Sequence, residues 1–134
     1  MAATGERRPG RRGQRRRLSR SADFDRVFRD GRSYSTRHLV LHAFPRASAD
    51  GATGEEDGPR LGVSVGRRVG NAVERNRVKR LLREAFWAVA PTLDPGHDFV
   101  IVARADVADL TRDGGQAAVE AAVRELAADA GPAT

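Results

Sequence analysis

The sequence predicts an α+β fold in which helices pack against one four-stranded sheet, with the element order αβββαβα. Apolar residues recur at helical spacing in three segments, and they alternate or run together in four shorter ones. The 134 residues, 40% of them hydrophobic, suffice for one core but not for two. We therefore expect one domain over residues 18–130, after a disordered arginine-rich arm at 1–17 and before a frayed tail at 131–134.

The first predicted helix spans Ser21 to Asp30. Ser21 is a suitable N-cap, and the apolar side chains of Phe24, Val27 and Phe28 recur at i, i+3 and i+4. One face of this helix therefore carries two aromatic rings.

Extended segments follow the first helix at residues 33–35, 38–44 and 61–65. In the last of them Gly62 and Ser64 leave one face small, so another group can approach it closely. Residues 46–59 are acidic and rich in glycine and alanine, which predicts a flexible loop between the second and third strands.

A second helix is predicted from Asn71 to about Ala90, with Asn71 and Glu74 as a capping-box pair. Its apolar stripe consists of Val78, Leu81, Leu82, Ala85 and Val89, and the roughly opposite side carries Arg75, Asn76, Lys79, Arg80 and Arg83. Like charges at helical spacing repel one another, and only Glu74 and Glu84 at the edges offset them. This face is therefore expected to bind a polyanion.

The last two predicted elements are a buried strand at 98–103 and an alanine-rich amphipathic helix at 116–129. They complete the αβββαβα order.

Positive charge is concentrated in two blocks. Residues 1–20 and residues 60–83 each contain eight basic residues and one glutamate, a net charge of +7, although the whole chain carries only +6. Such blocks attract polyanions. Arg67 and Arg68, in a glycine-flanked turn just before the second helix, add cations where helix-terminal amides also favour phosphate. Nucleic acid is the expected partner.

Several classes of site are disfavoured. The chain has no cysteine, and therefore no disulfide or thiolate metal site. It lacks the ~20 consecutive apolar residues of a membrane span, and no apolar segment follows its arginine-rich start to act as a signal peptide, so we expect a cytoplasmic protein without a membrane partner. No nucleotide-binding glycine motif occurs, and we expect neither a small-molecule substrate nor a cofactor or metal bound by the protein itself.

The segment Arg60–Phe86, RLGVSVGRRVGNAVERNRVKRLLREAF, closely resembles the signature of the bacterial ribonuclease P protein component. The RNR motif of that family falls on Arg75, Asn76 and Arg77, and the resemblance extends over roughly Leu18 to Leu126. It implies a ribonucleoprotein endoribonuclease in which the RNA subunit removes the 5′ leader of precursor tRNA, with Mg²⁺ at the RNA active site. It also implies an unusual left-handed crossover through the second helix.

The resemblance further implies two sets of binding residues and no catalytic residue in the protein. The catalytic RNA would be contacted by Arg67, Arg68, Asn71, Arg75, Asn76, Arg77, Lys79, Arg80 and Arg83. The leader would lie in a cleft between the first helix and the sheet, lined by Phe24, Phe28, Tyr34 and Arg37. For the two phenylalanines, a purely structural place in the core stays open as an alternative.

Two other functions are weaker alternatives. A general RNA-binding or ribosome-associated protein would use the same basic helix without any role in cleavage. A nuclease in its own right would need a metal site or an acid–base pair, and the histidines at 38, 42 and 97 have no clustered carboxylates beside them.

Overall fold

The computed structural model describes residues 16–18, 21–45, 58–93 and 96–130. Its strands are β2 (Arg16–Arg17), β3 (Arg32–Ser35), β4 (Leu39–Pro45), β5 (Arg60–Val65) and β6 (His97–Ala103). Its helices are α2 (Ser21–Asp30), α4 (Ala72–Val89) and α5 (Val107–Ala130), with the short 3₁₀ turns η2 (Arg67–Val69) and η3 (Ala90–Thr92).

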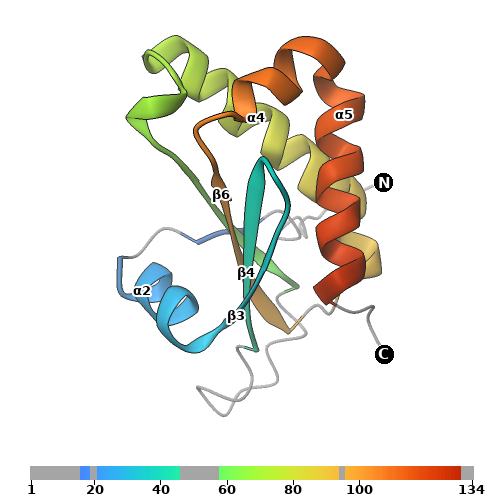
Figure 1. The fold of residues 1–134 in the computed structure, drawn as a ribbon. Helices are drawn as coiled ribbons and strands as arrows, with labels where there is room; N and C mark the ends of the chain where they lie inside the picture. The colour runs from blue at the N-terminus through green and yellow to red at the C-terminus, as the bar shows by residue number, and fades with distance from the viewer. Residues whose placement is uncertain (1–15, 19–20, 46–57, 94–95, 131–134) are drawn as a thin grey trace, which may run out of the picture.

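One mixed sheet forms the centre of the molecule, with the strand order β2-β5-β6-β4-β3. The strands β3, β4 and β6 pair antiparallel, whereas β5 and β6 lie parallel and are connected through α4 (Figure 1). The four predicted strands and the αβββαβα order are confirmed. The left-handed sense of the crossover stays a prediction.

The two-residue strand β2 was not predicted. It adds a fifth strand by pairing parallel to the start of β5, and the Leu18 N–H then donates to the Leu61 carbonyl at 2.9 Å. The predicted boundary of the arm after Arg17 is therefore corrected, because Arg16 and Arg17 belong to the sheet. Residues 1–15 of that arm, 46–57 of the predicted loop and the tail at 131–134 lie outside the described residues.

The two faces of the sheet are covered unequally (Figure 1). On the first, which we call the α4 face, α4 and α5 enclose the main core. Its fully buried members include Leu39, Leu41, Leu82, Phe86 and Phe99. On the second, the α2 face, Leu18, Val27, Phe44 and Val100 form a smaller cluster. Because side chains alternate along a strand, successive residues of β4 serve the two clusters in turn.

The main helices begin as the sequence predicts. The helix α2 spans the predicted residues, and α4 starts after a complete capping box in which the Asn71 side chain accepts from the Glu74 N–H and the Glu74 side chain accepts from the Asn71 N–H. The predicted apolar stripe of α4 is buried.

The C-terminal helix α5 consists of the predicted helix and an additional one before it. Gly115 has non-helical dihedral angles (φ 58°, ψ −146°), which glycine adopts readily, so two helices meet at a kink there and the second begins at Gln116, as predicted. Val107 is fully buried and Thr111 is 3% exposed, so packing holds the first two turns in place.

Candidate nucleic-acid interface

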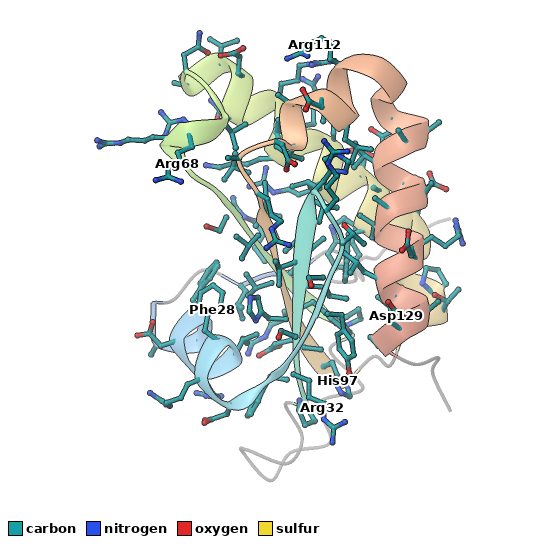
Figure 2. All side chains as sticks on the ribbon, in the orientation of Figure 1. Phe28, Arg32, Arg68, His97, Arg112 and Asp129 are labelled. Atoms are coloured by element: carbon teal, nitrogen blue, oxygen red, sulfur yellow. The ribbon has the colours of Figure 1, made fainter. Side chains whose placement is uncertain are left out.

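The basic residues on and before α4 form one surface, which we call the basic face. Its cations are Arg67, Arg68, Arg75, Arg77, Lys79, Arg80 and Arg83, and Asn71 and Asn76 lie among them. The turn η2 presents the first two, and the capping box fixes where the helix begins. Figure 2 shows Arg68 pointing outward ahead of α4.

None of these seven cations makes an ion pair with any residue that the structure describes. Six other arginines in the described part of the chain do: Arg26, Arg29, Arg37, Arg60, Arg112 and Arg124 each lie within 4.0 Å of a carboxylate oxygen. Unpaired cations gathered on one helix repel one another. An external polyanion would relieve that repulsion, so the arrangement favours phosphate binding.

The basic face has two parts. Arg77 and Arg80 are exposed, whereas Arg75, Lys79 and Arg83 are half-buried. The half-buried residues are four apart and therefore lie in a row along one side of the helix. Burial lowers the pKa of Arg83, and the positive charge of Arg17 lowers it further. At the C-terminal end of this row, the guanidinium group of Arg83 therefore lies near that of Arg17.

The aromatic side chains of α2 lie against the α2 face of the sheet. The rings of Phe24 and Phe28 are 6.3 Å apart, and the Phe28 ring meets the His42 ring edge-on at 4.8 Å. Phe28 is 42% exposed, which leaves its ring available for stacking. We call Phe24, Phe28 and His42 the aromatic surface; Figure 2 shows Phe28 on α2, on the opposite side of the sheet from α5.

Phe24 belongs to the fold as well as to this surface. A Cβ atom on Gly62 would lie 2.4 Å from the tip of the Phe24 ring, so the ring rests directly on the strand backbone. This is the close approach that the small face of β5 predicted. A purely structural role in the core therefore applies in part to Phe24, and much less to the exposed Phe28.

Tyr34 and Arg37 do not lie with these aromatics, and their expected place in the cleft is wrong. Tyr34 pairs with Leu41, and residues directly opposite each other share a face, so it packs against the core on the α4 face. Arg37 lies in the turn before β4, where its Nε is 3.4 Å from a carboxylate oxygen of Asp106 at the start of α5.

His42 belongs to the aromatic surface, although the sequence did not predict it as a site residue. It pairs with Ser33 of β3 and Val100 of β6, and it projects from β4 onto the α2 face. The alternation of β4 already placed it on the side opposite Leu41. What the sequence could not show was that α2 crosses this face with Phe28 beside the imidazole.

His42 should make the fold less stable in acid. Burial lowers the pKa of His42 below its usual 6.5, so below pH 6.5 the unfolded chain binds more protons at this site than the folded one. The free energy of unfolding should therefore fall as the pH drops from 7 toward 5. Urea titrations at several pH values should show that the free energy of unfolding falls less steeply with decreasing pH in His42→Phe than in the wild type. Phenylalanine keeps a ring against Phe28 but does not titrate. Identical pH profiles for the two proteins would refute this role.

The described residues contain no group of three histidine or carboxylate side chains placed to hold a metal ion. No helix among them is long and apolar enough to cross a bilayer.

The chain is similar to ribonuclease P proteins in both sequence and fold. The model of the Ribonuclease P family matches residues 13–127. The ribonuclease P protein component of Shouchella clausii is 41% identical over 95 residues, covering 71% of this chain and 72% of that protein. The one from Clostridium acetobutylicum is 42% identical over 88 residues, covering 66% and 69%.

Solved structures agree with the sequence matches. The Staphylococcus aureus RNase P protein superimposes with a TM-score of 0.69 at 29% identity, over 86% of this chain and 94% of that one. The Thermotoga maritima RNase P protein gives a TM-score of 0.70 at 26% identity, over 84% and 96%.

Proposed function

The chain belongs to the ribonuclease P protein component family, and we propose that it binds both the catalytic RNA subunit and the 5′ leader of precursor tRNA. The family makes it a protein subunit of a ribonucleoprotein endoribonuclease. The observation that carries the proposal is the set of seven cations without an ion-pair partner among the described residues.

The basic face is the surface that we assign to the catalytic RNA. Guanidinium groups and the Lys79 ammonium neutralise phosphates, and released counterions drive the association. A protein cation and a Mg²⁺ ion relieve the same repulsion between RNA phosphates. Bound protein should therefore lower the Mg²⁺ concentration that the folded RNA and its substrate require. The hydrolytic Mg²⁺ ions would be held by RNA, and the protein would supply no catalytic group.

The aromatic surface is the part that we assign to the leader. Stacking of a base on an aromatic ring contributes ~1 to 3 kcal/mol and accepts any base, which suits leaders of varied sequence. Phe28 offers the exposed ring, and His42 and Phe24 hold it from two sides.

The experiment is cleavage of a precursor tRNA by a bacterial ribonuclease P RNA at low Mg²⁺, with the protein, without it, and with the protein alone. Strong stimulation that requires both components is expected. Tight RNA binding without stimulation would instead indicate a general RNA-binding module. Cleavage by the protein alone would contradict both functions.

Replacing Phe28 with Ala should weaken leader binding and leave holoenzyme assembly intact. The loss of one stacked base corresponds to about 1 to 3 kcal/mol, roughly 5- to 150-fold in affinity. The measurement compares holoenzyme affinity for precursor and for leaderless tRNA, with RNA-subunit affinity determined separately. Leaderless tRNA is the internal control, because it should bind equally to both proteins. Equal losses of leader binding and assembly would show that Phe28 acts only through the fold.

A further inference from the structure

A small pocket lies at the outer edge of β5, between the basic face and the aromatic surface. Its volume is about 180 Å³. At roughly 30 Å³ per water, it holds about six waters, enough for one phosphate group and part of its hydration. Arg17 and Arg83 line it from the α4 side, Phe24 lines it from the α2 side, and the backbone of Gly62 and Val63 lies between them.

Strand register explains why the two arginines meet here. Arg17 pairs with Leu61, whose side chain belongs to the core under α4, and paired residues share a face. The Arg17 side chain therefore leaves β2 on the α4 face, beside the end of the half-buried row of α4. Arg83 is the last member of that row.

The described residues that line the pocket carry positive charge and no negative charge. No carboxylate is among its lining residues, and neither Arg17 nor Arg83 makes an ion pair or side-chain hydrogen bond with a described residue. The proximity of Arg17 also helps to lower the pKa of Arg83, after the larger effect of burial. An oxyanion between two adjacent guanidinium groups relieves their repulsion and accepts charge-assisted hydrogen bonds from both.

The edge of β5 adds a backbone donor. Pairing with β2 ends after the Leu18 N–H donates to the Leu61 carbonyl. Alternate residues of a strand direct their backbone groups to the same edge, so the Val63 N–H faces the same way as the Leu61 carbonyl. Val63 also lines the pocket, so this alternation places its N–H at the edge of the strand that borders the pocket.

We propose that this edge pocket binds one phosphate group of a single RNA strand, with Arg17 and Arg83 as its cationic ligands and the Val63 N–H as a donor. The strand passes around the edge of β5 and joins the basic face to the aromatic surface. Identification of that strand as the leader rests on the proposed function; the phosphate site itself does not.

The first test is a titration of the full chain with inorganic phosphate, followed by the backbone amide resonances of Gly62 and Val63. Sodium chloride at matched ionic strength separates binding from screening. We expect saturable shifts with phosphate, weakened roughly tenfold or more in Arg17→Gln and in Arg83→Gln. The control is Arg124→Gln, which removes an arginine from the exposed surface of α5 and should bind as the wild type does.

A stability measurement distinguishes binding from a structural role. Without phosphate, Arg17→Gln should be at least as stable as the wild type, because it removes repulsion. With phosphate, it should lose the rise in melting temperature that binding gives the wild type. A variant that is destabilised equally in both buffers would overturn the assignment of Arg17 as a ligand.

The second test uses an RNA pentanucleotide and the same pentanucleotide with uncharged methylphosphonate linkages. Shifts at Val63 with the first and not with the second support an RNA phosphate. Saturation by inorganic phosphate alone would overturn the RNA-strand assignment and leave a free-oxyanion site. Loss of binding in Arg124→Gln as well would overturn the pocket altogether.

The two proposals can fail separately. If the wild type stimulates the catalytic RNA but phosphate does not saturate the pocket, this inference fails and the proposed function stands. If phosphate and RNA bind at Val63 without any stimulation of cleavage, the proposed function fails and the phosphate site stands.

Discussion

Replacing Arg60 with Met should destabilise the fold by about 3 to 5 kcal/mol, since it breaks a buried ion pair from one side. The Arg60 guanidinium donates to both carboxylate oxygens of Asp98, at 2.8 and 2.7 Å, and Asp98 is only 1% exposed. Methionine keeps the length and apolar character of the side chain. The Asp98 carboxylate loses both charge-assisted hydrogen bonds in an interior that solvates it poorly.

The effect should be large relative to the whole stability of the domain, which for a chain of this size is about 5 to 15 kcal/mol. Urea titration monitored by circular dichroism measures it directly. The matched control is Arg124→Met, which breaks the exposed pair with Glu120 at 3.0 Å and should cost about 0.5 kcal/mol or less. If both substitutions cost the same, burial of the Arg60 pair would not be what makes it important.

The pair also bears on function through α2. Arg60 lies 3.9 Å from Asp23 in the first turn of the helix that carries the aromatic surface. Asp23 is itself mostly buried, with 13% of its side chain exposed. Arg60 thus connects β6, β5 and α2. Loss of this connection should also disturb the position of Phe24, the next residue along the helix.

The parts of the fold predicted from sequence are those specified by local signals. The capping box at Asn71 and the i, i+3, i+4 apolar pattern of α2 depend on residues within one or two turns, so both helix starts were located correctly. The basic face was found for the same reason. Charge spacing along one helix needs no tertiary information.

The parts that were missed depend on contacts between distant segments. The strand β2 consists of two arginines without any apolar alternation, and it is placed by pairing with residues more than forty positions away. The helix before the Gly115 kink of α5 was also missed, because it ends at two glycines, which are poor helix formers, and burial of Val107 compensates for them.

The candidate site shows the same division. Phe24 and Phe28 were recognised from their helix, but Tyr34 was placed on the wrong face because its register against Leu41 is not visible in the sequence. His42 and the pocket between Arg17 and Arg83 arise only where three elements meet. The sequence therefore predicted the identity of the candidate binding residues better than it predicted which of them lie close together in the fold.

Replacing Arg68, Arg77 and Arg80 together with Gln should weaken binding to the catalytic RNA by roughly a hundred- to a thousandfold. All three are exposed, and none makes an ion pair or side-chain hydrogen bond with a described residue. The fold should therefore keep its stability, while each lost charge-assisted contact costs about 1 to 1.5 kcal/mol of binding free energy.

The salt dependence of binding separates contact from general attraction. If each arginine neutralises one phosphate, the slope of log K against log salt should become shallower by about 0.9 per residue, nearly three in total. The control triple variant Arg29→Gln, Arg112→Gln and Arg124→Gln changes net charge equally, but each of its arginines is exposed and already paired with a carboxylate. It should keep nearly the whole slope, because those arginines release no RNA counterions. Equal slopes for both triple variants would mean that net charge, and not the basic face of α4, drives the association.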